Sequence, residues 1–420
     1  MKTQLLTAGL TSTLALALLL GAPQTAQAEV VAREGKGFLE KRADGNLVLH
    51  VSGTPYEMGF QHGRLLKKQV KQNLTNIVDN QTKMGKSDTY QAYVMMRPLM
   101  HSMLRPNIPK RYLEEMRGVA EGAGLEYDMV EAGNLFPAAF HCSGIALQGK
   151  ATADGSLYHV RILDYMTKLG LQDTALVIKH APKGRKRWLN VGFAGFIGTV
   201  TGMNESKVAI GEMGGKGLGH WNGMPMPLLM REALETASTM EEAVEIFRKA
   251  KRTCEYYYVI SDGKTNRSTG IWCTEKVFET ILPGQTFTFI EKAKLRRQAA
   301  GGKAFGKDVK VTVDKHSILI KGAKGLQTFV AMPPKDSLIM SGPHRYAEFA
   351  RRLSANYGKV DAKLLQEMVK RPVSMKSNLH VAIFHPETLE VWVAIAGKDG
   401  TPACDMPYAK YTLKSSTASK

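Results

Sequence analysis

The sequence predicts an α+β protein in which antiparallel sheets pack against helices. The 420-residue chain has 44% hydrophobic and 23% charged residues, the balance of a folded globular protein. Helical apolar spacing dominates the chain up to about residue 135, and two groups of strand-like runs follow, separated by one helical stretch. This order contains few β-α-β units, which argues against a parallel sheet.

The N-terminus has the three parts of a secretory signal. Lys2 supplies the positive charge, residues 5–20 the apolar stretch, and residues 26–28 (Ala-Gln-Ala) the small-x-small cleavage pattern. We therefore expect residues 1–28 to be removed, so that the mature protein starts at Glu29 and is periplasmic or secreted. The alternative, a retained membrane anchor, needs an apolar run of ~20 residues.

Residues 29–141 are predicted to form a mainly helical N-terminal segment. A strand runs up to Gly53, and the residues after it have helical apolar spacing. Two further helical stretches are expected at residues 90–104 and 112–124, and Gly124 is a stop signal for the second.

Residues 142–413 are predicted to form the main β-rich domain. Its strand-like runs are interrupted by a helical stretch at 226–251, in which Thr239 is the expected N-cap and Glu242 its reciprocal partner. The polar residues 414–420 are expected to be a disordered tail.

The net charge of +19 favours acidic partners. Basic clusters occur at residues 183–187 and 292–297, but they lack the interleaved aromatic residues of single-strand binders and any zinc-finger spacing. Nucleic acid is therefore not an expected partner. Solvated loop charge and contact with an anionic membrane surface remain the two interpretations.

Two of the four cysteines lie at the ends of neighbouring strand-like runs. A two-residue loop at Gly263 and Lys264 would place Cys254 directly opposite Cys273. Export permits a disulfide there, and a disulfide or free thiols remain equal alternatives.

Several common catalytic motifs are absent from the sequence. It has no GxSxG elbow, no phosphate-binding GxxxxGK[ST] loop and no HExxH pair, and its eleven histidines show no metal-ligand spacing. We expect no metal and no cofactor. His62, in GFQHG, is expected to be a core or turn histidine.

Cys142 stands at the first position of a strand-like run, without the flanking signature of papain-like enzymes. The remaining chemical use of such a cysteine is as an N-terminal nucleophile. Cleavage before Cys142 would liberate an α-amine with an ordinary pKa of ~7.7–8.0. That amine can act as the general base for the thiol of its own residue.

In these features and in several further segments, the chain resembles a known family, the penicillin acyltransferase-like autoprocessing peptidases. These belong to the N-terminal nucleophile hydrolase superfamily and are related to the choloylglycine hydrolases. The similar segments are residues 53–66, 114–125, 142–165, 202–213 and 378–394.

The resemblance implies a four-layer αββα fold and autocatalytic cleavage between His141 and Cys142. It also implies that the two fragments stay associated and that the substrate is an acylated small molecule with an amide bond. The histidine before the cleaved bond is a departure, because the best-known fungal member has glycine there.

The resemblance also assigns roles to three residues. Cys142 is the nucleophile, and Arg161 and Asp164 match the Arg-x-x-Asp pair that surrounds its thiol and amine in the superfamily. A guanidinium favours a thiolate and a carboxylate orients an ammonium.

The hairpin geometry can be predicted from its Asp-Gly turn at residues 154–155. If those two residues form the whole loop, Gly144 faces Tyr165 and Cys142 shares a face with Arg161. Asp164 would then point away, so we expect the strand to bulge or bend at residues 162–164, which lets both Arg161 and Asp164 reach Cys142.

The oxyanion-hole residues depart from the family pattern. Related hydrolases often use asparagine amides from two strands, whose counterparts here read GEMGG and CEYYYVISDG. Asn204 is a candidate, but it is expected to cap the turn at residues 202–206. Backbone N–H groups or the hydroxyls of Tyr256, Tyr257 and Tyr258 are the other candidates.

The sequence therefore predicts an exported amidase or acyltransferase that uses Cys142 and acts on a small acylated amide. One alternative is a lipid acyl hydrolase acting on phospholipid-like or ceramide-like substrates. The other is an uncleaved, non-catalytic binder of anionic envelope material.

Overall fold

The computed structural model describes most of the chain after the predicted signal peptide. The described residues are 28–83, 98, 101–135, 141–165, 167–215, 220–285, 310–313, 317–321, 327–331 and 333–414. The predicted signal peptide up to residue 27, the tail after residue 414 and most of the helix predicted at 90–104 lie outside this set. Among the described residues, no helix has the length and apolarity that a membrane span requires.

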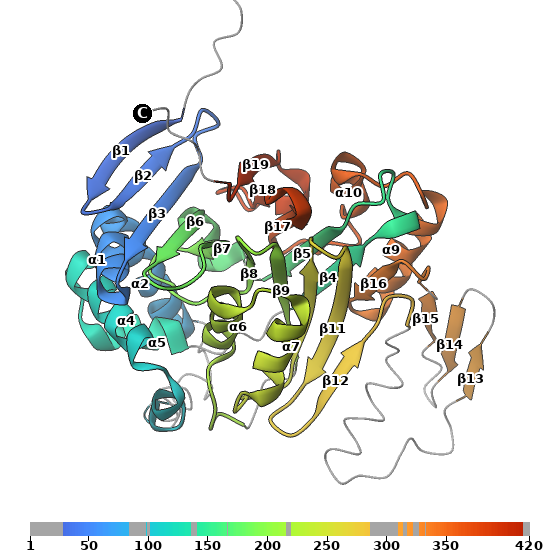
Figure 1. Cartoon of the computed structure of the whole chain (residues 1–420), viewed down its shortest axis with the longest axis horizontal. Coiled ribbons are helices and arrows are strands. Elements are labelled where there is room, and N and C mark those ends of the chain that lie inside the picture. Colours follow the sequence, from blue (N-terminus) through green and yellow to red (C-terminus); the bar gives the residue numbers. More distant parts are fainter. Residues whose placement is uncertain are drawn as a thin grey trace, which may run out of the picture.

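One layer of the fold is a large sheet (Figure 1). Its strands are β1 (Glu29–Glu34), β2 (Gly37–Lys41), β3 (Leu47–Gly53), β6 (Ala175–Pro182), β7 (Trp188–Phe193), β8 (Thr201–Asn204), β9 (Val208–Gly214), β10 (Tyr256–Asp262), β11 (Arg267–Cys273) and β12 (Phe278–Ile281). In the described part of the chain these ten strands lie side by side in that same order. Their pairs are antiparallel except for β3 with β6, which are parallel.

The second layer is a smaller antiparallel sheet. Its strands are β4 (His141–Leu147), β5 (Tyr158–Asp164), β16 (Ser337–Met340), β17 (Asn378–His385), β18 (Glu390–Ile395) and β19 (Ala409–Thr412). They lie in the order β16-β4-β5-β17-β18-β19. A separate small sheet consists of β13 (Lys310–Val313), β14 (Ser317–Lys321) and β15 (Gln327–Ala331).

Helices cover the outer faces of the two main sheets. The α-helices are α1 (Pro55–Leu65), α2 (Lys67–Lys83), α4 (Lys110–Ala123), α5 (Tyr127–Leu135), α6 (Met226–Thr236), α7 (Met240–Lys249), α9 (Pro343–Ala355) and α10 (Ala362–Met368). Short 3-10 helices are η1 (Arg105–Asn107), η2 (Gly149–Ala151), η3 (Thr167–Leu169), η4 (Leu171–Thr174), η5 (Pro386–Thr388) and η6 (Ala403–Asp405). As expected, the Thr239 hydroxyl caps α7 by accepting from the Glu242 N–H at 3.1 Å.

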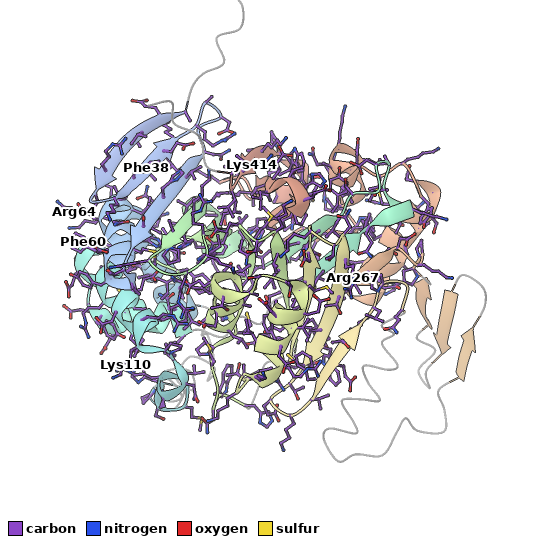
Figure 2. All side chains as sticks on the ribbon, in the orientation of Figure 1. Phe38, Phe60, Arg64, Lys110, Arg267 and Lys414 are labelled. Atoms are coloured by element: carbon purple, nitrogen blue, oxygen red, sulfur yellow. The ribbon has the colours of Figure 1, made fainter. Side chains whose placement is uncertain are left out.

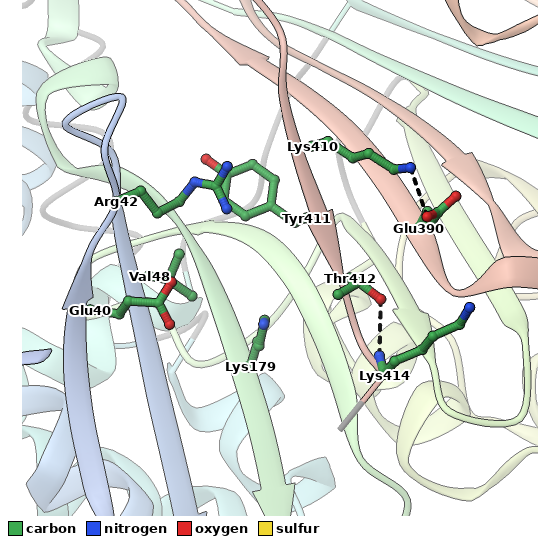
Figure 3. A pocket seen from close by; sticks show the side chains of 9 residues that line it. All are labelled: Glu40, Arg42, Val48, Lys179, Glu390, Lys410, Tyr411, Thr412 and Lys414. Atoms are coloured by element: carbon green, nitrogen blue, oxygen red, sulfur yellow. Dashed lines mark hydrogen bonds and ion pairs between the residues drawn. The ribbon is translucent and has the colours of Figure 1, made fainter. Parts of the chain in front are cut away.

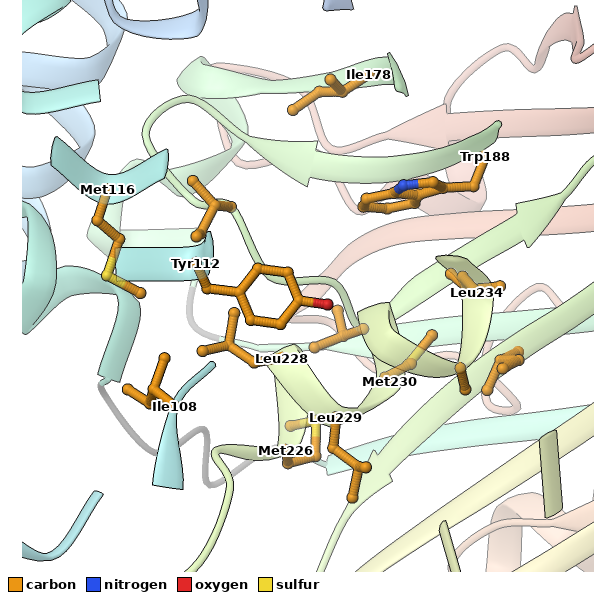
Figure 4. Close-up of a cluster of buried hydrophobic side chains, with 14 of the residues drawn as sticks. Ile108, Tyr112, Met116, Ile178, Trp188, Met226, Leu228, Leu229, Met230 and Leu234 are labelled. Atoms are coloured by element: carbon orange, nitrogen blue, oxygen red, sulfur yellow. The ribbon is translucent and has the colours of Figure 1, made fainter. Parts of the chain in front are cut away.

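Three hydrophobic clusters hold these layers together. The first joins the large sheet to α1, α2, α4, α5, α6 and α7, and Figure 4 shows Tyr112 of α4, Trp188 of β7 and Leu228 of α6 within it. The second packs α9 and α10 on the small sheet and continues between the sheets, while the third fills the space between them near β19. The order helix, sheet, sheet, helix confirms the αββα sandwich.

Helices α1 and α4 approach each other closely through glycine. Gly59 and Gly63 of α1 face Gly118 and Gly122 of α4, and a Cβ on Gly59 would lie 2.0 Å from the carbonyl oxygen of Glu115. The backbones can come this close because glycine has no side chain. The glycines of GFQHG and of the second helix therefore fix the packing of the N-terminal segment.

The N-terminal segment begins with three strands, of which the sequence predicted only the one that ends at Gly53. The short strands β1 and β2 form hairpins with their neighbours in the chain, β1 with β2 and β2 with β3. Strand β3 also pairs with β6, which lies beyond Cys142 in the chain. Residues on both sides of Cys142 therefore share one sheet.

The predicted two-residue turn of the β4–β5 hairpin is wrong. Leu147 pairs with Tyr158, and Gly144 pairs with Arg161 rather than with Tyr165. The Asp-Gly turn does form, with Gly155 at φ +75°, but it is part of a longer connection that includes η2. The register differs from the prediction by an even number of residues, so the faces of the strands are as predicted.

The predicted bulge lies in a different strand. The pairing of β4 with β5 is regular, whereas β17 shifts register against β5 between Asn378 and His380. The irregularity therefore lies beside Asp164, but in β17 and not in β5.

The proposed Cys254–Cys273 disulfide is also wrong. The four cysteines are free. The turn between β10 and β11 has four residues, with Asn266 at φ +51° and the Asp262 carboxylate accepting from the Lys264 N–H at 2.8 Å. This longer turn places Tyr256, and not Cys254, opposite Cys273.

Candidate active site

Cys142 is buried at the start of β4, on the face that meets the large sheet. Its residue is 6% exposed. A Cβ on Gly144, two positions further along, would contact Met213 of β9 and Val259 of β10. Because side chains alternate along a strand, Cys142 points in the same direction as Gly144. The thiol therefore lies between the two sheets.

Arg161 of β5 reaches the thiol from the neighbouring strand. Its side chain is fully buried, and Nη2 donates to Cys142 Sγ at 3.2 Å. Nε donates to the carbonyl oxygen of Val200 at 3.3 Å, and Nη1 donates to that of Ile162. A Cβ on Gly211 would lie 2.9 Å from Arg161 Cδ, so glycine at 211 leaves room for the arginine. The guanidinium is thus held in place beside the sulfur.

Glu212 of β9 completes this group. Its side chain is fully buried, and Arg161 Nη2 donates to Oε2 at 3.4 Å. Within the described residues, Oε1 has no hydrogen-bond partner. Burial raises the pKa of Glu212 to about 7, although Arg161 opposes this. The carboxyl therefore changes charge near neutral pH, and it does so next to the Arg161 guanidinium, which contacts the thiol.

Asp164 belongs to a second group on the other side of β4. Its carboxylate forms an ion pair with Arg345 of α9 and accepts from the Met375 N–H at 3.0 Å and from Asn378 Nδ2 at 3.1 Å. Arg345 Nη2 donates in turn to the carbonyl oxygen of Cys142 at 3.1 Å. Asp164 points away from the face that Cys142 shares with Arg161, because β5 lacks the bulge that was expected to turn it toward Cys142. It acts on Cys142 through Arg345 and the backbone.

The surroundings of Cys142 disfavour the thiolate. Burial, with a contribution from the carboxylates of Glu212 and Asp164, raises the pKa of the thiol to about 11, although Arg161 opposes this. At neutral pH the sulfur of the intact chain is therefore protonated, and it needs a base before it can attack a carbonyl.

Replacement of Glu212 by glutamine is expected to make the stability less dependent on pH. A carboxyl whose pKa is raised from 4.5 to about 7 stabilises the fold below about pH 4.5. This contribution is lost as the pH rises to about 7, and glutamine does not titrate. From about pH 4.5 to about pH 7, the variant should gain up to about 3 kcal/mol relative to its parent.

Denaturant unfolding at several pH values within this window measures the effect. Both proteins carry Cys142→Ala, so that thiol chemistry does not interfere. A stability difference that stays constant across the window contradicts the titration of Glu212.

Sequence reasoning missed Glu212, Arg345 and Asn378. Glu212 had one usable signal, a single carboxylate within the apolar run VAIGEM. Arg345 had no usable signal in the sequence. It lies on a surface-type helix, and its ion-pair partner Asp164 is 181 positions away in the chain.

The side chains that were candidates for the oxyanion hole lie in different parts of the structure. Asn204 holds the end of α6, since Nδ2 donates to the carbonyl oxygens of Leu234 and Ala237 at 2.9 and 2.8 Å. Its Oδ1 accepts from the Val208 N–H at 3.0 Å, so it has the capping role that was expected.

The three candidate tyrosines lie on both faces of β10. Tyr256 and Tyr258 pack into the cluster beneath the helices, on the face of β10 opposite to the one that meets Cys142. Tyr257 belongs to the cluster that contains Cys142, and its hydroxyl donates to Glu255. Tyr257 remains the candidate on the correct side.

The nearby histidines are held neutral. His159 and His380 are buried between the sheets and bond to Ser261 Oγ and Thr201 Oγ1, each at 2.9 Å. Burial lowers the pKa of His159 to about 3, and burial also lowers the pKa of His380 well below its usual value. His62 is a buried core histidine, as expected, and accepts from the Gly195 N–H at 2.9 Å. In the described part of the chain, no group of acidic, histidine or cysteine side chains has a metal-site arrangement.

Comparison with protein-family models identifies one family. Residues 151–270 match the model described as acyl-coenzyme A:6-aminopenicillanic acid acyl-transferase. The predicted family resemblance is confirmed. The stretch that matches this acyltransferase family includes Arg161, Asp164 and Glu212.

Individual relatives of the chain carry related names. It is 26% identical to protein dcd1A of Dictyostelium discoideum over 249 residues, which is 52% of this chain and 56% of that protein. It is 25% identical to mouse N-acylethanolamine-hydrolyzing acid amidase over 180 residues, 40% of this chain and 48% of the amidase. The chain thus spans about half the length of these curated relatives. A solved structure of the Caenorhabditis elegans ortholog of that amidase aligns at 14% identity and a TM-score of 0.41, covering 65% of this chain and all of the other.

Proposed function

We propose that this chain is an exported cysteine N-terminal-nucleophile enzyme. In this proposal the chain cleaves itself before Cys142 and then breaks the amide bond of an N-acylated small molecule. The observation that supports it best is the hydrogen bond from Arg161 to the buried thiol of Cys142, the second residue of β4. The family match points to the same class of acyl chemistry.

Self-cleavage starts when the thiol loses its proton and Sγ attacks the carbonyl carbon of His141. The new S–C bond replaces the C–N bond between His141 and Cys142, and the nitrogen takes up a proton. Water then hydrolyses the thioester. The products are a carboxylate on His141 and a free α-amine on Cys142.

The free amine provides the base that the intact site lacks. It accepts the thiol proton, and Sγ attacks the carbonyl carbon of the substrate amide. The C–N bond breaks, the leaving amine takes the proton from the α-ammonium, and the acyl group remains on sulfur as a thioester. Water activated by the α-amine releases the acid, or an acceptor amine takes the acyl group. The same site therefore supports hydrolysis and acyl transfer.

The two fragments are expected to stay together through buried ion pairs. Arg231 of α6 is 1% exposed and donates to both carboxylate oxygens of Glu115 in α4, at 2.8 and 2.6 Å. Its Nε also donates to Glu235 at 2.7 Å. Glu115 precedes the cleaved bond and Arg231 follows it, so this pair links the fragments.

The N-terminal segment also holds the loop after β7. His62 binds the N–H of Gly195, and Asn134 donates to its carbonyl oxygen at 2.9 Å while accepting from the Ile197 N–H at 2.8 Å. The same loop ends at Val200, whose carbonyl oxygen accepts from Arg161. The N-terminal fragment therefore helps to position Arg161 and is part of the working enzyme.

Replacement of Glu115 by alanine should weaken the association of the fragments strongly. Removing one partner of a buried ion pair leaves the other charge uncompensated, which typically costs ~3–5 kcal/mol. Denaturant unfolding measures the loss of stability, and gel filtration of the cleaved protein tests whether the fragments separate.

Glu114 provides the matched control. It is the preceding residue, its side chain is 45% exposed, and it forms an ion pair with Arg117 within the same helix. Its replacement by alanine should change the stability by about 0.5 kcal/mol or less. Equal effects of the two substitutions would contradict the linking role of Glu115.

A substrate panel tests the proposed activity. Purified protein is incubated with fatty-acyl and aryl-acyl amides and with esters of the same acids, and Cys142→Ala serves as the inactive control. Release of amine and acid from the amides supports the proposal. Turnover of the esters alone indicates the lipid acyl hydrolase, and an uncleaved chain without turnover indicates the non-catalytic binder.

A further inference from the structure

A basic groove lies between the two sheets at the β19 edge. It consists of two adjoining cavities of about 490 and about 230 Å³ that share Lys179 and Lys414. Figure 3 shows the larger cavity between β2, β3 and β6 on one side and β18 and β19 on the other. Three strands, β5, β17 and β18, separate β19 from β4. The groove is therefore separate from the site at Cys142.

The lining of this groove carries an excess of positive charge. The larger cavity is lined by four cations and two carboxylates: Arg42, Lys179, Lys410, Lys414, Glu40 and Glu390. The smaller cavity adds Lys36 and Arg187, of which Arg187 forms an ion pair with Glu205 at 2.7 Å. Phe38 and Lys414, both labelled in Figure 2, also line the smaller cavity. The positive charge is thus concentrated at one open place.

The two carboxylates leave Lys179 without a close counterion. Glu390 forms an ion pair with Lys410 at 2.7 Å, and Glu40 bonds to His50 at 3.2 Å. Within the described residues, Lys179 has no ion pair within 4.0 Å, and it is partly buried. Burial lowers the pKa of its ammonium, which Glu40 only partly offsets. An anion in the cavity would stabilise this charge.

Aromatic rings hold two of the other cations at the rim. The guanidinium of Arg42 lies over Tyr411, 4.6 Å from the ring centroid, and Lys410 lies 5.0 Å from that of Trp392. Such contacts limit the freedom of long side chains and keep their charged ends near the cavity. The cations are therefore partly arranged before any ligand arrives.

We propose that this groove binds a phosphate ester. A phosphate ester anion suits the positive charge that Lys179 and Lys414 leave in the larger cavity after Arg42 pairs with Asp44 and Lys410 with Glu390. Arginine and lysine are the usual side chains that bind phosphate. The ester is the headgroup of an anionic phospholipid or a soluble phosphate ester. In the first case the groove docks the enzyme on an anionic membrane surface. The net charge of +19 would then favour membrane binding.

Vesicle sedimentation and ligand titration test the proposal. The wild-type protein is mixed with vesicles of phosphatidylglycerol or phosphatidylcholine, and separately titrated with glycerol phosphate. The test variant is Lys179→Met with Lys414→Gln. The control is Lys249→Gln with Lys363→Gln, which removes the same charge from exposed positions on α7 and α10.

Loss of two groove cations should weaken binding about thirtyfold, while the control should change it little. Binding to phosphatidylglycerol vesicles without binding to glycerol phosphate supports a lipid headgroup, and binding to both supports a phosphate ester in either form. Equal weakening in the test and control variants, or no binding to any of the three by the wild type, overturns the proposal. If Lys179→Met does not fold, Lys410→Gln replaces it, since that side chain is half exposed.

Discussion

Cys142→Ala is expected to leave the chain uncleaved and to abolish amide hydrolysis. In the proposed mechanism the thiol is the nucleophile in both reactions, and alanine has no atom that can form the thioester. Loss of a nucleophile lowers turnover by at least ~10⁴-fold in comparable hydrolases. A denaturing gel measures the cleavage, and release of amine from an acyl amide measures the turnover.

Cys254→Ala is the matched control, because Cys254 is also a buried cysteine without a disulfide, but it precedes β10 and its thiol donates to the carbonyl oxygen of His220. This variant should cleave and turn over substrate like the wild type. Cleavage of the Cys142→Ala chain at the same bond would show that another group attacks it.

Arg161→Lys is expected to slow both self-cleavage and turnover by about a hundredfold or more, the scale for loss of one positioned hydrogen-bond donor in an active site. Lysine keeps the positive charge, but it lacks the planar fork that contacts Cys142 Sγ, Glu212 and Val200 together. Because the hydrogen bond from Arg161, in addition to its charge, lowers the pKa of the thiol, loss of that bond should also move the alkaline rise of the cleavage rate to higher pH.

The rate of cleavage as a function of pH distinguishes this role from a structural one. A damaged fold would lower the rate at every pH without moving the profile. Arg267→Lys on β11 provides the control, since Arg267 is exposed and pairs with Glu241 on the surface (Figure 2). An unshifted profile for Arg161→Lys would contradict a direct effect on the thiol.

The sequence was sufficient to predict which residues share a face in the nucleophile hairpin, but not their register. The predicted turn at Asp154 and Gly155 is present within a longer connection. The resulting shift is even, so Cys142 and Arg161 still point the same way. For the β10–β11 hairpin a similar shift removed the expected pairing of Cys254 with Cys273. Local patterns determine side-chain alternation well, whereas loop length depends on how the loop packs.

The parts of the site that could not be predicted come from distant segments. Glu212 and Arg345 reach Cys142 from β9 and α9 and act through Arg161 and through the backbone. No local spacing connects them with Cys142, because only the packing of the two sheets and of α9 on the small sheet brings them together. The strands β1 and β2 were missed for another reason: they are short, and their conformation depends on pairing in the local hairpins that they form with each other and with β3.

Intact-mass spectrometry of the purified protein tests the central claim most directly. We predict two chains, the second of which begins with Cys142 and has a free α-amine. A single chain that continues through His141 and Cys142 and still hydrolyses acyl amides would contradict the account, because the site would then work without the base assigned to it.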